Sequence, residues 1–85
     1  MRKTLIVLLY LLAPVMALAG PVNINTADAE SLSRELTGIG LAKAQAIVDY
    51  RNEHGPFDVA EELLKVKGVG PRVLAANRDN IRTSD

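Results

Sequence analysis

Two copies of one pattern set the architecture of this chain: Leu36-Thr37-Gly38-Ile39-Gly40 and Val66-Lys67-Gly68-Val69-Gly70. The copies lie 30 residues apart, and each places one aliphatic residue between two glycines. Glycine permits a positive φ angle and interrupts a helix, so each copy is expected to form a tight turn. Helical sequence lies on both sides of each turn, which indicates an internal duplication. We therefore expect two helical hairpins packed together, because one hairpin cannot bury its own apolar side.

The first hairpin is expected over residues 26–54, after an extended lead-in at residues 20–25. Thr26 is the expected N-cap of its first helix, because its hydroxyl can accept a hydrogen bond from a backbone N–H. The second helix is expected over about residues 41–54, where apolar residues recur with helical spacing. Gly55 follows at a position that favours a positive φ angle and ends the helix.

The second hairpin is expected over residues 58–82. Asp58 is the expected N-cap of the third helix, with Glu61 three residues later in a capping-box arrangement. Pro71 suits the first position of the fourth helix, where no backbone N–H is needed. No stretch alternates with period two, so no strand is expected and the fold class is all-α with four to five helices. The expected core residues include Ile39, Phe57, Leu63, Leu64, Val69, Val73, Leu74 and Ile81.

Each glycine turn leads directly into a helix whose first backbone N–H groups have no partner inside the helix. Such donors, at the positive end of the helix dipole, are suited to binding a phosphate group. A phosphate contact positions a protein on a nucleic acid without identifying any base. Two turns related by the repeat would present two phosphate sites on one face, in reach of both strands of a duplex. The candidate DNA-binding residues are Gly38, Ile39, Gly40, Lys43, Lys67, Gly68, Val69, Gly70 and Arg72.

Charge is distributed unevenly along a chain whose formal net charge is zero. Residues 20–64 contain three basic and eight acidic side chains, whereas residues 65–85 contain five basic and two acidic ones. Lys67 lies within the second turn, Arg72 two residues after it, and Lys43 three residues after the first. Binding to nucleic acid through these cations is expected to weaken as salt rises.

The first 19 residues are expected to be a signal peptide that is cleaved on export. A cationic Met1-Arg2-Lys3 is followed by an apolar run over residues 5–13, and Ala17 and Ala19 fit an A-x-A cleavage site. The apolar stretch is shorter than the ~20 residues that a membrane span needs. The chain has no cysteine, so its core must be stable without a disulfide.

Several ordered motifs carry a resemblance to a known family: Val22-Asn23-Ile24-Asn25-Thr26-Ala27, Leu36-Thr37-Gly38-Ile39-Gly40, Lys43-Ala44-Gln45-Ala46-Ile47-Val48, Tyr50-Arg51, Gly55-Pro56-Phe57 and Leu64-Lys65-Val66-Lys67-Gly68-Val69-Gly70-Pro71. Across residues 22–82 the chain resembles the tandem helix-hairpin-helix (SAM-domain-like) domain of ComEA-type competence proteins. It differs at Thr37 and Leu41, where that family often has proline.

The resemblance implies sequence-independent binding of double-stranded DNA and no catalysis. For a short exported form, it implies a soluble periplasmic receptor that binds incoming DNA during natural transformation and acts as a ratchet. Its partners would be duplex DNA and the DNA-uptake machinery at the inner or outer membrane, with no small-molecule substrate. No side chain demands a cofactor, although the family would allow a monovalent cation on the turn carbonyls.

Two other functions remain open from the residues alone. Small helical hairpin domains also serve as protein–protein adaptors, and the acidic first half favours this alternative. The domain also resembles DNA-targeting parts of nucleases and repair enzymes, but the expected signal peptide argues against that role. The sole histidine, His54, is expected to complement the end of its helix rather than act in catalysis. Glu61 and Glu62 are interpreted as first-turn acids, since neighbouring residues on a helix do not face each other.

Overall fold

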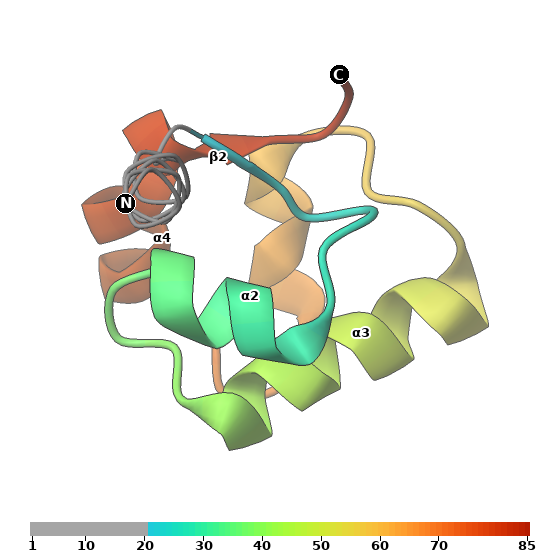
Figure 1. The fold of residues 1–85 in the computed structure, drawn as a ribbon, viewed down its shortest axis with the longest axis horizontal. Helices are drawn as coiled ribbons and strands as arrows, with labels where there is room; N and C mark the ends of the chain where they lie inside the picture. The colour runs from blue at the N-terminus through green and yellow to red at the C-terminus, as the bar shows by residue number, and fades with distance from the viewer. Residues whose placement is uncertain (1–20) are drawn as a thin grey trace, which may run out of the picture.

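The computed structural model describes residues 21–85 of the 85-residue chain, so the expected signal peptide at residues 1–19 lies outside the described residues. The described part is mostly helical, which confirms the predicted fold class (Figure 1). Its elements in chain order are β1 (Val22–Asn23), α2 (Ala29–Glu35), α3 (Leu41–His54), the 3-10 helix η1 (Ala60–Lys65), α4 (Pro71–Asn77), the 3-10 helix η2 (Arg78–Asn80) and β2 (Ile81–Arg82).

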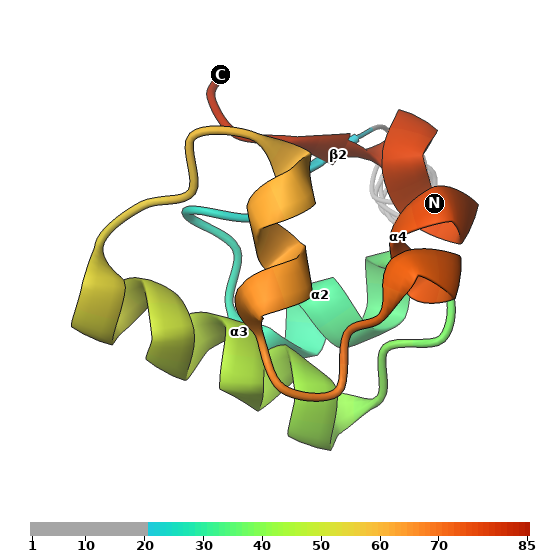
Figure 2. The same cartoon turned by 180° about the vertical axis from the view of Figure 1, so that it is seen from behind.

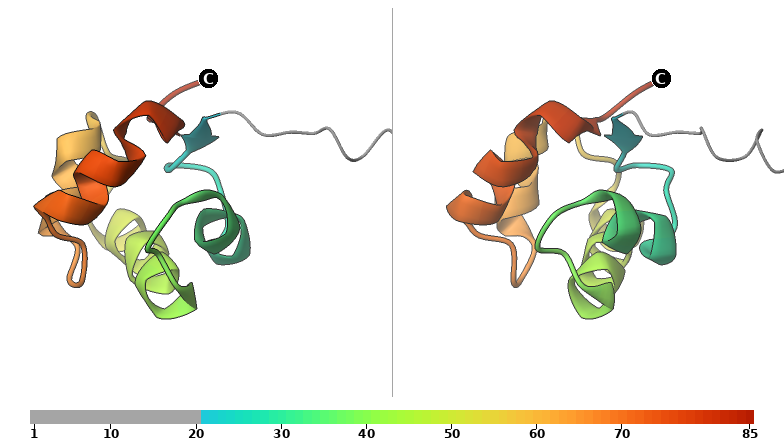
Figure 3. Two further views of the ribbon diagram at one scale, coloured as in Figure 1. Left: turned by 90° about the vertical axis from the view of Figure 1, so that its left-hand side faces the viewer. Right: turned by 60° about the vertical axis from the view of Figure 1, so that its left-hand side comes forward.

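The core lies between the two hairpins. In Figure 1 α2 lies in front of η1, and in Figure 2, from behind, η1 lies in front of α2. Figure 3 shows the pair formed by η1 and α4 beside α3 and α2. Both hairpins supply buried side chains, so neither has a core of its own. The buried apolar residues are Ile24, Leu32, Leu36, Ile39, Ala44, Ile47, Phe57, Leu63, Val66, Val69 and Leu74.

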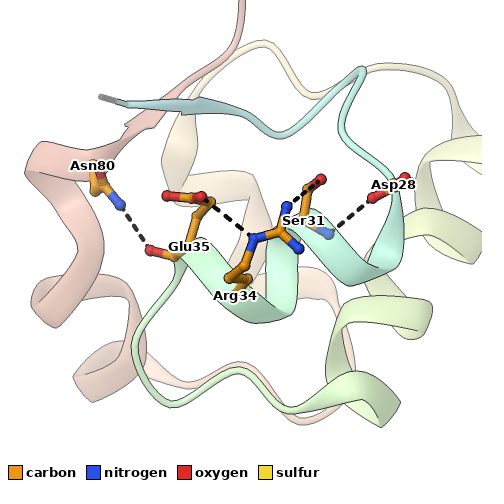
Figure 4. A network of polar contacts seen from close by, with 5 residues as sticks. All are labelled: Asp28, Ser31, Arg34, Glu35 and Asn80. Atoms are coloured by element: carbon orange, nitrogen blue, oxygen red, sulfur yellow. Dashed lines mark hydrogen bonds and ion pairs between the residues drawn. The ribbon is translucent and has the colours of Figure 1, made fainter. Parts of the chain in front are cut away.

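Helix α2 begins later than its sequence suggests, because Asp28 and not Thr26 is the N-cap. The backbone N–H groups of Thr26 and Ala27 both donate to the carbonyl of Asn23, at 3.2 and 3.0 Å, and this turn keeps Thr26 out of the helix. An oxygen of the Asp28 carboxylate accepts a hydrogen bond of 2.8 Å from the Ser31 N–H (Figure 4). The prediction for Thr26 was therefore wrong.

The Asp28 cap is expected to make the stability of the fold depend on pH in the acidic range. Hydrogen bonds from Ser31 to the Asp28 carboxylate lower the pKa of Asp28 below its ordinary value. A carboxyl whose pKa is lower in the folded state stabilises the fold above its unfolded pKa, and this contribution is lost as pH falls through the folded value. We expect Asp28→Asn to keep the cap but to weaken the loss of stability below about pH 4. Thermal unfolding followed between pH 7 and pH 2 tests this; an unchanged acid profile in Asp28→Asn would contradict it.

Helix α3 has the predicted bounds, and Gly55 ends it with a φ of +95°. The guanidinium of Arg51, in the last turn of this helix, donates a hydrogen bond of 2.9 Å to the carbonyl of Ile24. Arg51 thus links the lead-in segment to α3, and its guanidinium is engaged by a backbone carbonyl of the domain.

The third predicted helix is a 3-10 helix, and its N-cap is Val59 instead of Asp58. The capping-box prediction was wrong in its partner, because the Asp58 N–H donates to the carboxylate of Glu62 at 2.7 Å. A 3-10 helix has three residues per turn, so residues three apart share a face. Leu63 and Val66 are accordingly buried, whereas Leu64 is 42% exposed and does not belong to the core as predicted.

The predicted core also differs at two further positions, since Val73 and Ile81 are only partly buried against it. Ile81 lies in a short parallel strand pair, which contradicts the prediction of no strand: Val22 pairs with Ile81, and Asn23 with Arg82. Two-residue strands are too short to produce a visible alternation in sequence. They form because the packing of the hairpins brings the two ends of the domain together.

Candidate functional site

The two predicted turns share a positive φ angle at their first glycine. Gly38 and Gly68, the first glycine of each copy, have φ angles of +77° and +94°, which residues other than glycine rarely adopt. Ile39 and Val69, between the glycines, are buried at 4% and 5% exposure and anchor each turn to the core, as predicted.

The second glycine of each copy has a different role. Gly40 and Gly70 have extended backbones, with φ of −80° and −108°, and are the N-caps of α3 and α4. Among the described residues, neither has a neighbouring atom within 4 Å of the position that a Cβ would occupy. Their backbone geometry and internal packing would both tolerate a side chain. Because neither glycine has a side chain, a ligand can approach the backbone closely at both positions.

Backbone N–H donors lie at and just after Gly40 and Gly70 in the sequence. The first hydrogen bonds of the two helices run from Ala44 to the Gly40 carbonyl, at 2.9 Å, and from Leu74 to the Gly70 carbonyl, at 3.1 Å. Neither glycine provides a side-chain cap. The N–H groups that precede these bonds have no acceptor within residues 21–85; they belong to Gly40, Leu41, Ala42 and Lys43 in the first turn and to Gly70, Arg72 and Val73 in the second.

The turns pack against each other in a reciprocal way. A methyl group placed on Gly38 would lie 3.8 Å from Cγ2 of Val73, and one placed on Gly68 would lie 3.3 Å from Cγ of Lys43. Val73 and Lys43 occupy the same position in the two copies of the repeat, five residues after the first glycine. This exchange is what an approximate two-fold axis between the hairpins requires. Both turns therefore lie at one end of the molecule, opposite β1 and β2 (Figure 2).

Cations without a partner are concentrated at this end of the fold. Of the five basic side chains in residues 21–85 that lie outside the predicted site, all except Lys65 have a hydrogen-bond or ion-pair partner within the described part. Arg34 lies 3.8 Å from Glu35, Arg82 lies 3.7 Å from Asp85, and Arg51 donates to a carbonyl. The Arg78 guanidinium donates to the Glu61 carboxylate and lowers the pKa of Glu61 below its ordinary value. The basic side chains with no hydrogen bond or ion pair in the described part are Lys43, Lys65, Lys67 and Arg72.

Asn77 positions the first turn, although no sequence signal indicated it. Its side chain is 3% exposed; Oδ1 accepts from the Thr37 N–H at 2.7 Å, and Nδ2 donates to the Thr37 carbonyl at 2.8 Å and to the Val73 carbonyl at 2.9 Å. The amide thus pairs with both backbone groups of Thr37, the residue before Gly38. A lone asparagine near a helix end gives no hint of a partner 40 residues away.

The other candidate groups occupy ordinary positions. His54 stacks on Tyr50, with ring centroids 4.2 Å apart, at the end of α3 farthest from the turns. Within residues 21–85, no three His, Cys, Asp or Glu side chains are grouped so that they could bind a metal. Nor does any helix of this part have the length and apolar character to cross a membrane.

The monovalent cation allowed by the resemblance would bind turn carbonyls. The carbonyl of Thr37 accepts a hydrogen bond from Asn77, and that of Val66 accepts one from the Val69 N–H at 3.1 Å. Each carbonyl has a second lone pair, so these bonds are compatible with a cation. The cation stays a prediction.

The chain is similar to several known proteins. Its identity to an uncharacterized protein of Haemophilus influenzae is 55% over 60 residues, covering 71% of this chain and 54% of that protein. Its identity to ComE operon protein 1 of Bacillus subtilis is 47% over 60 residues, covering 71% of this chain and 29% of that protein. Its identity to the rat endonuclease/exonuclease/phosphatase family domain-containing protein 1 is 42% over 71 residues, covering 84% of this chain and 12% of that protein.

The chain spans about half the length of the Haemophilus protein and less of the other two. Residues 19–82, most of the chain, match the family described as the helix-hairpin-helix motif. The paired glycine turns, each between two helical segments, have the architecture that this description names. The chain belongs to the helix-hairpin-helix family.

Proposed function

We propose that the domain over residues 26–82 binds double-stranded DNA through the sugar-phosphate backbone, without sequence preference. The observation that carries this proposal is the pair of glycine turns at one end of the described fold, each with backbone N–H groups that have no acceptor among residues 21–85. Phosphate oxygens are strong acceptors, and a backbone without a Cβ allows them to approach. Contacts of this kind position a protein on a duplex but distinguish no base pair.

Electrostatics supports the same face. Lys67 and Arg72 are exposed beside the second turn, and no carboxylate pairs with either of them in residues 21–85. A nucleic acid could therefore bind these cations without displacing an internal partner. Elsewhere on the described surface, most basic side chains are already engaged. Lys65, which the sequence analysis did not select, joins this group because it too is exposed and without a partner.

Charge removal at the second turn is expected to change the salt dependence of binding. Each phosphate neutralised by a lysine or arginine contributes about −0.9 to the slope of log K against log salt. We expect Lys67→Gln with Arg72→Gln to make this slope shallower by about 2 and to weaken binding equally for duplexes of different sequence. Fluorescence anisotropy with two unrelated duplexes, at several salt concentrations, measures both effects.

The matched control is Arg82→Gln. This residue lies in β2, at the end of the fold opposite the turns, and is paired with Asp85 (Figure 1). Its replacement also removes one positive charge but should leave the slope unchanged. If Arg82→Gln and the double variant lose the same slope per charge, binding depends on net charge and not on this face.

We also propose that the protein is exported to the periplasm and there acts as a receptor for DNA during natural transformation. The charge and apolar pattern of residues 1–19 supports export. The similarity to ComE operon protein 1 supports a part in competence. Deletion of the gene is expected to reduce both transformation and the amount of DNA that accumulates in the periplasm. Unchanged uptake would refute this role and leave duplex binding intact.

The adaptor alternative is separated from DNA binding by one titration. At about 20 mM salt, where phosphate contacts are strongest, a duplex-binding domain must give saturable binding. No binding under this condition would favour the adaptor, whose support is the excess of acidic over basic side chains in residues 20–64.

A further inference from the structure

We infer that Lys43 serves both turns: its backbone N–H belongs to the first turn and its ammonium group acts at the second. The inference rests on the proposed DNA binding and concerns how the charge at that site is arranged. In sequence, Lys43 follows Gly40 and belongs to the first hairpin. Its side chain, however, extends across the fold to the other turn.

The contact between Lys43 and the second turn involves three carbon atoms along the aliphatic part of the Lys43 side chain. Measured from the position of a Cβ on Gly68, the Cγ, Cε and Cδ atoms of Lys43 lie at 3.3, 3.6 and 3.7 Å. The chain of methylene groups therefore lies flat on the second turn, and Gly68 has no side chain that would push it away. Lysine commonly packs its methylene groups on a surface in this way and keeps its ammonium group in solvent.

The two phosphate positions become chemically unequal as a result. Lys43 reaches the second turn, where Lys67 is the chain neighbour of Gly68 and Arg72 follows Gly70. At the first turn the equivalent contact comes from Val73, an uncharged side chain that packs on Gly38. The exposed neighbours of this turn, Thr37 and Leu41, are also uncharged.

The physical consequence is a division of the binding free energy between the turns. Three cations surround the second turn, each able to neutralise one phosphate of the DNA backbone there and release its counterions, so the contribution of this turn depends on salt. The first turn binds with neutral backbone donors, so its contribution changes little with salt. Salt should therefore weaken mainly the contact at the second turn.

A double-mutant cycle on the full chain tests this assignment. Lys43→Met keeps the packing on Gly68 and removes the charge, and Lys43→Arg keeps the charge. Gly40→Asn and Gly70→Asn each place an acceptor at one turn, where it competes with phosphate. All variants are first checked for folding by circular dichroism, and duplex binding is then measured by anisotropy.

We expect Lys43→Met to weaken binding about tenfold near 50 mM salt, the factor that counterion release for one phosphate supplies, and Lys43→Arg to bind like the wild type. The loss should remain about tenfold in the Gly40→Asn background and shrink below about twofold in the Gly70→Asn background. Gly40→Asn should leave the salt slope unchanged. If the wild type binds but the loss caused by Lys43→Met shrinks in the Gly40→Asn background, or in neither background, the inference is overturned. If the wild type does not bind duplex DNA, the proposed function is overturned as well.

Discussion

Replacing both Gly40 and Gly70 by asparagine is expected to lower the affinity for duplex DNA about 100-fold while the domain stays folded. Asparagine is among the most favourable N-cap residues, because its side-chain oxygen accepts from the backbone N–H two or three residues later. In the variant that oxygen would occupy the donors assigned to phosphate. Loss of one hydrogen bond to a charged group at each turn, at about 1.5 kcal/mol apiece, gives the stated factor.

The N-cap of α2 already shows the side-chain hydrogen bond that we expect asparagine to make at positions 40 and 70. Asp28 has φ and ψ of −84° and 172°, and in that conformation its side chain accepts from the Ser31 N–H. Gly40 has nearly the same angles, −80° and 179°, and no atom of the described part lies within 4 Å of the position that its Cβ would take. The thermal stability of the double variant should therefore equal or exceed that of the wild type.

The control for this variant places the same residue at another helix start. Val59 is the N-cap of η1 and is 50% exposed, and η1 begins at the end of the fold away from the turns (Figure 2). Val59→Asn should bind duplex like the wild type. A folded Gly40→Asn, Gly70→Asn variant that also binds like the wild type would show that phosphate does not use the turn amides.

The second large effect is on stability. Asn77→Ala is expected to lower the free energy of unfolding by about 3 kcal/mol, because it removes the three hydrogen bonds, each worth about 1 kcal/mol, that the buried Asn77 amide makes with Thr37 and Val73. For a domain of this size the corresponding decrease in melting temperature is about 15 °C. Differential scanning calorimetry or thermal circular dichroism measures the change.

Asn80 provides the comparison. It is half-buried, and its side-chain Nδ2 donates a single hydrogen bond of 2.8 Å to the carbonyl of Glu35 (Figure 4). Asn80→Ala should therefore cost only about 1 kcal/mol. If the two variants lose the same stability, the Thr37 contacts contribute nothing beyond an ordinary surface hydrogen bond.

Much of the candidate site could be predicted from the two glycine patterns. The positive φ angles of Gly38 and Gly68 and the buried side chains of Ile39 and Val69 agree with the prediction. The sequence did not reveal that the glycines of each pair have different roles. It also assigned Lys43 to the first turn alone, because residues close in sequence were assumed to act together.

The misplaced elements share one physical origin. Thr26 and Asp58 both have the chemistry of an N-cap, but each lies in a segment tied to a distant part of the chain. Asn25 donates to the carbonyls of Phe57 and Thr83 and accepts from the Phe57 N–H, all at 2.7–2.9 Å. These bonds keep the segment before η1 extended, which delays the start of that helix.

The amino-acid sequence by itself determined the two turns, the bounds of α3 and the duplicated architecture, since these depend on backbone preferences within a few neighbouring residues. Tertiary structure alone decided the 3-10 geometry of η1, the pairing of β1 with β2, the bond from Asn77 to Thr37 and the position of Lys43 on Gly68. Each of these depends on contacts between residues that lie 25 or more positions apart, and their favourable energy exists only once both hairpins have packed.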